Sequence, residues 1–337
     1  METEHNIRLT STEIAALWTT YQNDTLAKCV LSYFLSKVED KEIKGVVELA
    51  LSISETHIGQ LTELFQSENF PIPLGFTGED VNVNARRLFS DSFFLYYIKN
   101  MSKVGLTTYG MTYSMASRAD TRTFFGDALR ETMTLDKKVT QVLQNKGLYI
   151  RPPSIPTPDH IDFVKNQSFL FGGFFGFGEK RPLLSMEIGQ LFANIQTNSL
   201  GKALLMGFAQ VVRSQEIRDY LLTGKEISNN HIKSFSETCL DEDIPVPMTW
   251  DPDVMDSTEP PFSDKLILFH VSLLVTAGTA NYAVSMAASP RKDVAANYVK
   301  LTAEIAAYAN HGAKLMIENG WLEEPPQSPD RRKLVKA

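Results

Sequence analysis

Three residues whose side chains bind metals or carry protons are spaced so that they could meet inside one helical bundle. They are Asp24, His57 and Glu131. Each lies on or beside the apolar stripe of a predicted helix. Counting 1.5 Å per residue along antiparallel helices places all three at nearly the same height. Two carboxylates and one imidazole form a ligand set that suits Fe(II) or Mn(II), so a metal centre with oxidase-like activity is one interpretation.

The other interpretation is a buried hydrogen-bond layer, and the sequence favours it. A di-iron bundle needs Glu-x-x-His on two helices, but Ser54 and Ser228 stand where those glutamates would be. A buried histidine between polar partners satisfies all three groups without a metal. We therefore expect no cofactor, with Fe or Mn as the alternative. The candidate ligands under that alternative are Asp24, His57, Glu131, His231 and Glu304.

The elements that would position these residues occur twice. His57-Ile58 and Glu63 recur as His231-Ile232 and Glu237, and Pro71-x-Pro73 recurs as Pro245-x-Pro247, all 174 positions apart. Later features, such as Phe-Ser-Asp at 89–91 and again at 262–264, are offset by 173. The register extends over nearly the whole chain, which indicates an internal duplication. In the second copy, Asn198, His231 and Glu304 should form the equivalent layer.

Each copy should contain four helices. In the first copy, Thr10 and Glu13 have the spacing of a capping box at the start of the first helix. The following helices are expected over about 41–68, 91–115 and 121–146, with Asp120 as the last N-cap. A connection of about 20 residues separates the second helix from the third and suggests a crossover. This predicts an all-α protein of two tandem ferritin-like four-helix bundles, at 1–150 and 183–337.

Two further sets of residues have simpler interpretations. Pairs of arginine and aspartate follow the third helix of each copy and indicate turn structure, and two equivalent tyrosines indicate core packing. These residues are Arg118, Asp120, Arg291 and Asp293, and Tyr109 and Tyr282. Between the bundles, residues 151–182 begin with a proline-rich spacer and continue with an unusual Phe/Gly run, Phe169–Gly178. We expect that run to pack across the bundles or, alternatively, to mediate self-association.

Composition excludes several classes of partner. The 337 residues carry a net charge of −7, which argues against general affinity for nucleic acid. No apolar run reaches the length of a membrane span, and the polar start lacks the pattern of a signal peptide. The two cysteines form no CxxC motif, which favours a reducing compartment, so we expect a cytoplasmic protein.

Several motifs in order resemble a known family. They are Asp-Val-Asn at 80–82, Arg-Leu-Phe-Ser-Asp at 87–91, Lys-Gly-Leu-Tyr-Ile-Arg-Pro-Pro at 146–153 and Pro-Phe-Ser-Asp-Lys-Leu at 261–266. The chain resembles a domain-of-unknown-function family of endospore-forming bacteria. The resemblance implies tandem ferritin-like bundles without an assigned activity, and some members resemble spore-coat proteins. It implies no catalytic residues, and it adds spore association to the expected localisation.

The functional expectation is therefore a non-enzymatic binding or assembly protein with a role in sporulation or stress. The metal-binding, oxidase-like protein is the alternative. Motifs for nucleotide binding, serine hydrolases and HExxH metalloproteases do not occur in the chain.

Overall fold

The computed structural model describes residues 7–171 and 180–335. Over these ranges the chain forms helices and two isolated β-bridges, with no β-strand. The first copy contains α1 (Ser11–Lys37), α2 (Lys41–Ser67), α3 (Asp91–Met115) and α4 (Ala119–Asn145). The second contains α6 (Ser185–Val211), α7 (Gln215–Leu240), α8 (Asp264–Ala287) and α9 (Lys292–Glu318). The prediction of an all-α protein with two helical bundles is confirmed.

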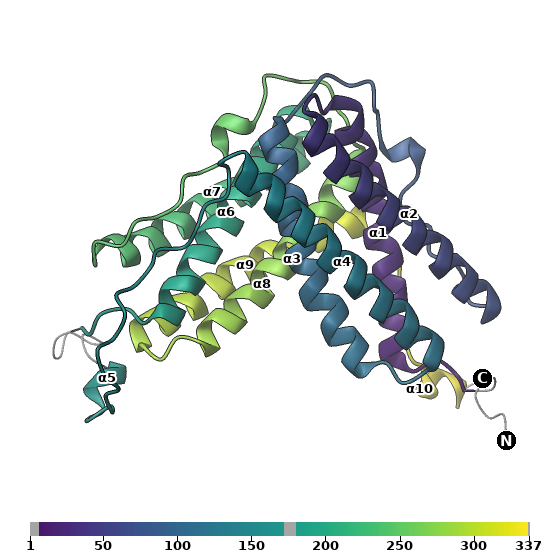
Figure 1. Cartoon of the computed structure of the whole chain (residues 1–337). Helices are drawn as coiled ribbons and strands as arrows, with labels where there is room; N and C mark the ends of the chain where they lie inside the picture. The colour runs from purple at the N-terminus through teal and green to yellow at the C-terminus, as the bar shows by residue number, and fades with distance from the viewer. Residues whose placement is uncertain (1–6, 172–179, 336–337) are drawn as a thin grey trace.

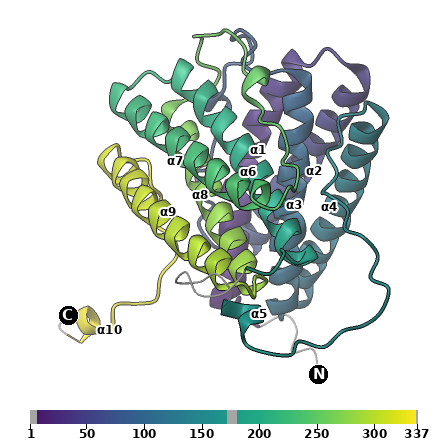
Figure 2. The same ribbon diagram turned by 90° about the vertical axis from the view of Figure 1, so that its left-hand side faces the viewer.

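The two bundles diverge from a common apex and form an inverted V (Figure 1). In each bundle the first helix packs on the second and the third on the fourth. Crossovers join the second helix to the third, and they contain the short 3-10 helices η2 (Gly78–Asp80) and η4 (Asp251–Asp253). After α4, the chain runs along the outside of the molecule to the single turn α5 (Ser168–Phe171), as Figure 2 shows. A short helix, α10 (Arg331–Leu334), follows the second bundle.

Local sequence signals explain most helix ends. Thr10 caps α1, and its hydroxyl and backbone N–H pair reciprocally with Glu13 as the capping box predicts. Gly147 ends the turn after α4 with a positive φ of 67°, a conformation that glycine adopts without strain. The predicted N-cap of α4 is wrong. Arg118 occupies that position, and Asp120 lies in the first turn of the helix, where its carboxylate binds the Arg118 guanidinium.

The two crossovers join the bundles through reciprocal bonds between equivalent residues. Ser263 caps α8 and donates its hydroxyl to Asp80 of the first crossover at 2.7 Å. Ser90 caps α3 and donates its hydroxyl to Asp253 of the second crossover. Isolated β-bridges, Val81 to Phe262 and Phe89 to Val254, reinforce both contacts. The apex is therefore a seam with approximate two-fold symmetry.

Two parts of the chain bear on the sequence expectations about a membrane span and about the Phe/Gly run. Helix α8 is long and apolar enough to cross a membrane by length and composition alone, with 28% of its most apolar window buried. The helix packs against α6 and α9 of the second bundle. Most of the Phe169–Gly178 run lies outside the described residues. Its described start contacts the second bundle, where Lys292 Nζ of α9 lies 5.7 Å from the centroid of the Phe171 ring.

Candidate functional site

The predicted polar layer forms in the first bundle. His57, on α2, is buried and places each ring nitrogen against a different carboxylate. Its Nδ1 lies 3.1 Å from Asp24 Oδ2 on α1, and its Nε2 lies 2.8 Å from Glu131 Oε2 on α4. Asp24 is buried, whereas the side chain of Glu131 is 38% exposed. The imidazole therefore connects an interior carboxylate with one at the surface.

The charges of the layer are coupled. Burial disfavours a charged imidazole, but the hydrogen bonds and charges of Asp24 and Glu131 outweigh that cost and raise the pKa of His57. Burial also raises the pKa of Asp24, although the contact with His57 opposes the rise. When His57 is protonated, one positive ring lies between two carboxylates. With both carboxylates ionised, the three groups then carry a net charge of −1.

The same geometry bears on the metal hypothesis. The two nitrogens of an imidazole point away from each other, so Asp24 and Glu131 lie on opposite edges of the ring and do not converge on one point. In the part of the chain that the structure describes, no group of three His, Cys, Asp or Glu residues is arranged to hold a metal ion. The residues present fit a hydrogen-bond chain better than a facial metal site, so we derive no chemistry through a metal.

The second bundle builds its layer with different partners. His231 Nε2 lies 3.1 Å from Glu304 Oε2, as the duplication predicts. Its Nδ1, however, contacts the Tyr282 hydroxyl at 2.9 Å, and Asn198 donates to that hydroxyl instead of contacting the histidine. Burial, with only one carboxylate to offset it, lowers the pKa of His231. Tyr282 is therefore part of the polar layer as well as the core, which the sequence interpretation missed.

A cavity of about 600 Å³ opens next to the layer of the first bundle. All four helices line it, and α1 and α3 contribute most of the residues. Asp24, His57 and Tyr109 provide polar groups, while Met101, Met111, Met115, Val104 and Leu135 provide apolar surface. Met111 and Met115 are 61% and 50% exposed. The cavity is in the size range of small-molecule sites.

The equivalent space in the second bundle is closed to about 70 Å³. Tyr308, at the position of Leu135, helps to fill it and stacks on Tyr220 with ring centroids 4.2 Å apart. Each of the two rings lies over a glycine of the opposite helix, Tyr308 over Gly224 and Tyr220 over Gly312. Next to the polar layer, the space is therefore much larger in the first bundle than in the second.

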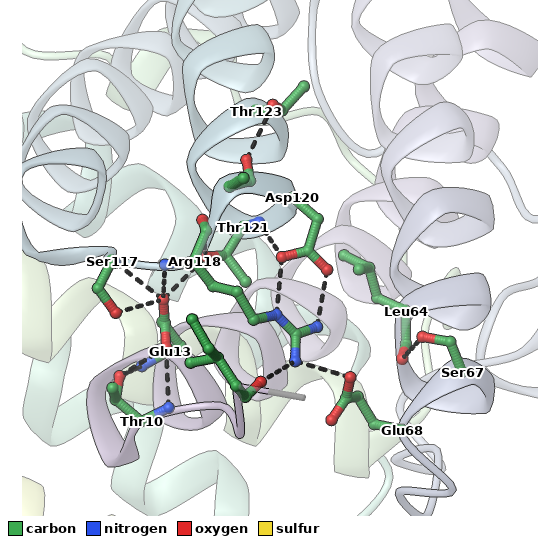
Figure 3. Close-up of polar contacts among 12 residues, drawn as sticks. Thr10, Glu13, Leu64, Ser67, Glu68, Ser117, Arg118, Asp120, Thr121 and Thr123 are labelled. Atoms are coloured by element: carbon green, nitrogen blue, oxygen red, sulfur yellow. Dashed lines mark hydrogen bonds and ion pairs between the residues drawn. The ribbon is translucent and has the colours of Figure 1, made fainter. Parts of the chain in front are cut away.

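The far end of the first bundle holds a second polar cluster, shown in Figure 3. Glu13 is fully buried and accepts hydrogen bonds from the backbone N–H groups of Ser117 and Arg118 at 2.9 and 2.8 Å. The Arg118 guanidinium binds Asp120 and Glu68. The second copy repeats the pattern: Arg291 binds Asp293 and Glu242, and Glu187 accepts from the Arg291 backbone. Because both copies have this polar cluster at the turn before their fourth helix, we assign it a structural role, as the sequence predicts for these turns.

With the geometry in place, comparison with known proteins identifies the family. The profile of the family described as "Protein of unknown function (DUF3231)" matches residues 1–161 and again 172–334. The chain belongs to this family. The two matches agree with the internal duplication, and they bear out the resemblance seen in the sequence motifs.

Other comparisons add little about function. No curated protein matches the chain. A solved structure of a proposed spore coat protein from Bacillus halodurans is similar over 46% of this chain and 100% of its own length. The two chains are 21% identical, with a TM-score of 0.42. A likeness at that level carries no argument about what this DUF3231 protein does.

Proposed function

We propose that this DUF3231 protein is a binding protein that takes up a small organic cation with an apolar body in the cavity of its first bundle. The observation that carries the proposal is the difference between the two copies. The cavity is about 600 Å³ in the first bundle, and the space around the equivalent layer of the second is about 70 Å³. Most positions that line the smaller space have counterparts in the larger one, which also extends further along α1 and α3. A bundle needs no such space for its own stability, because close packing is the favoured state of a core.

Charge supports a cationic ligand. The residues that line the cavity include no lysine or arginine. Asp24 lines the cavity, and when Asp24 and Glu131 are both ionised the layer keeps a net charge of −1 even with His57 protonated. A ligand ammonium next to Asp24 would favour its ionised form and oppose the burial that raises its pKa. The desolvated Asp24 carboxylate would pair with a ligand ammonium, while the methionines of α3 would cover its apolar body.

Binding is favoured over catalysis by the state of the histidine. A general base needs a ring nitrogen within reach of the proton it removes. Carboxylates already occupy both nitrogens of His57, so neither is open to a ligand in the cavity. The layer therefore suits recognition and positioning of a charged group rather than proton transfer from it.

A matched set of probes tests the proposal. 4-Phenylbutylammonium, 4-phenylbutanol and 4-phenylbutyrate share one apolar body and differ in the charge of the head group. Isothermal titration calorimetry should show the ammonium binding tightest at the cavity. Asp24→Asn, which copies Asn198 of the second bundle, should weaken ammonium binding about tenfold, equivalent to about 1.4 kcal/mol. Equal affinity for the ammonium and the neutral alcohol would contradict a cation site.

A second variant tests the location. The four substitutions Val46→Tyr, Ala50→Gly, Leu135→Tyr and Val139→Gly transplant the stacked tyrosines and their facing glycines from the second bundle. The packing already exists in this chain, so the variant should keep its helicity while losing the probe. Unchanged ammonium binding in this variant would place the ligand elsewhere.

The Fe or Mn alternative predicts a different result from the same residues. Protein incubated anaerobically with Fe(II) and Mn(II) and then desalted should retain no metal under our proposal. Retention of about one metal ion per chain, lost in His57→Ala, would support a metal centre and contradict the proposed organic ligand. A role in sporulation and a cytoplasmic or spore-associated location remain predictions from the sequence.

A further inference from the structure

A third cavity, of about 260 Å³, lies in the seam between the two bundles. Residues of α3 and α4 line one side, and residues of α6 line the other. Trp250, from the second crossover, also lines it and stacks on Tyr96 of α3 with ring centroids 3.8 Å apart. The Tyr96 hydroxyl donates to the Leu148 carbonyl at 2.6 Å, which fixes the stacked pair in place. We call this space the seam crevice.

Two lysines one helical turn apart line the crevice. Lys99 Nζ donates to Asp136 Oδ1 at 2.6 Å and to Thr140 Oγ1 at 2.8 Å. Lys103 has no carboxylate partner among the described residues. Much of the Lys103 residue is exposed, yet desolvation at the crevice and the Lys99 charge lower the pKa of its ammonium. With Asp136 as the one carboxylate in its lining, the crevice carries a net positive charge in a protein whose total charge is −7.

Comparison of the two copies shows which features of the crevice recur on the other side of the seam and which do not. The equivalent pair at the other side of the seam is Phe76 and Phe269, whose ring centroids are 5.1 Å apart. Aromatic packing is therefore kept in both copies. The lysines are not, because Ser272 and Thr276 stand at the positions of Lys99 and Lys103. The seam folds without them on one side, so their presence on the other needs a separate explanation.

We propose that the seam crevice binds a small aromatic anion, a carboxylate or a phosphate monoester. The Lys103 ammonium would pair with the anionic group, since Lys99 is already held by Asp136 and Thr140. Tyr149, Trp250 and the apolar side chains of Leu106 and Leu200 would contact the aromatic body. This site is independent of the cavity in the first bundle and selects the opposite charge.

Trp250 provides a direct readout of binding. A Trp18→Phe, Trp321→Phe background leaves it as the single tryptophan. In that background, 4-phenylbutyrate and phenyl phosphate should change Trp250 fluorescence at lower concentration than 4-phenylbutanol does. The more potent of the two anions would show whether the crevice prefers a carboxylate or a phosphate. If the neutral alcohol is as effective as both anions, the proposal is wrong.

Matched variants assign the charge. Lys103→Gln should weaken binding of the anions at least tenfold and leave the alcohol unaffected, while Lys103→Arg should retain most of the affinity. Lys137→Gln removes the same charge from an exposed position of α4 and should have little effect. The variant that fills the first-bundle cavity with tyrosines should still bind the anions. An equal loss of anion affinity in Lys103→Gln and Lys137→Gln would show that only the overall charge of the protein matters, and it would contradict the proposed site.

Discussion

Tyr97 and His270 are the same position in the two copies of the duplicated sequence, and they share a hydrogen bond with each other. The Tyr97 hydroxyl lies 3.1 Å from His270 Nε2 across the seam. Each also packs on the equivalent phenylalanine of its own bundle, Tyr97 on Phe34 and His270 on Phe208. A residue can contact its own counterpart only near a two-fold axis, so this pair marks the approximate axis of the molecule.

This contact predicts coupled effects on stability. Tyr97→Phe should lower the free energy of unfolding by about 1–3 kcal/mol, because it leaves a second unpaired nitrogen on a histidine whose Nδ1 is already buried without a partner in the described structure. His270→Phe removes the unpaired Nδ1 but leaves the Tyr97 hydroxyl without its partner, so the double variant should lose less stability than the sum of the two single variants. Chemical denaturation of both single variants and the double variant measures the coupling. Strictly additive effects would show that the bond contributes nothing to the seam.

Sequence reasoning reached the fold because its signals are local or repeated. The Thr10–Glu13 capping box, the glycine after α4 and the register of the duplication each depend on a few residues and on helix geometry. Counting along the helices also placed Asp24, His57 and Glu131 in one layer, and the structure brings these three side chains together.

What the sequence could not show depends on side-chain volume and direction. Asn198 has the right height to contact His231, but the longer Tyr282 occupies that space and receives the amide instead. Asp120 has the residue type of an N-cap, yet the helix begins at Ala119 and the Asp120 carboxylate binds the Arg118 guanidinium. The cavity of the first bundle depends on side chains from four helices together. One signal was available in the sequence: Tyr308 and Tyr220 replace the smaller Leu135 and Val46 at matching positions.

The two buried histidines should give the bundles opposite pH dependence. The pKa of His57 is raised, so its contribution to stability is fully present below the unfolded value of about 6.5 and is lost as the pH rises through the folded value. The pKa of His231 is lowered, so its contribution is present above about 6.5 and is lost as the pH falls. Burial also lowers the pKa of His270 in the seam, to about 4, which acts in the same direction as His231.

NMR titration of the histidine ring protons measures this difference directly, with His57→Gln and His231→Gln to assign the signals. The midpoint for His57 should lie above that of an unfolded peptide and the midpoint for His231 below it. Hydrogen exchange, corrected for intrinsic rates, should show α2 losing protection as the pH rises above the peptide value and α7 losing it as the pH falls below that value. Midpoints on the same side of the peptide value would refute the opposite charge states.

Glu13 should contribute to stability through its charge. The carboxylate is buried, which opposes ionisation, but the N–H groups of Arg118, Thr10 and Ser117 outweigh burial and hold the pKa of Glu13 well below its usual value. Glu13→Gln replaces one accepting oxygen by an NH₂ group that faces other donors, so we expect a loss of about 1–3 kcal/mol in the free energy of unfolding. Urea denaturation at neutral pH checks this, with Glu48→Gln at an exposed position of α2 as the control. A loss no larger than that of the control would mean that the cluster tolerates a neutral side chain.

Gly207 should be required by the close approach of the first crossover to α6. A Cβ atom at this position would lie 2.6 Å from the ring of Phe89, which is fully buried and stacks on Phe93. Gly207→Ala must therefore displace the ring, and we expect it to lower the free energy of unfolding by about 1–3 kcal/mol.

A Cβ atom at Gly201, in the same helix, would meet no neighbouring group of the described chain within 4 Å. Gly201→Ala should therefore stabilise the protein by about 0.5–1 kcal/mol, because alanine favours the helix. Thermal unfolding of the two variants measures both effects in the same protein. A Gly207→Ala protein as stable as Gly201→Ala would show that the seam can widen without loss of stability.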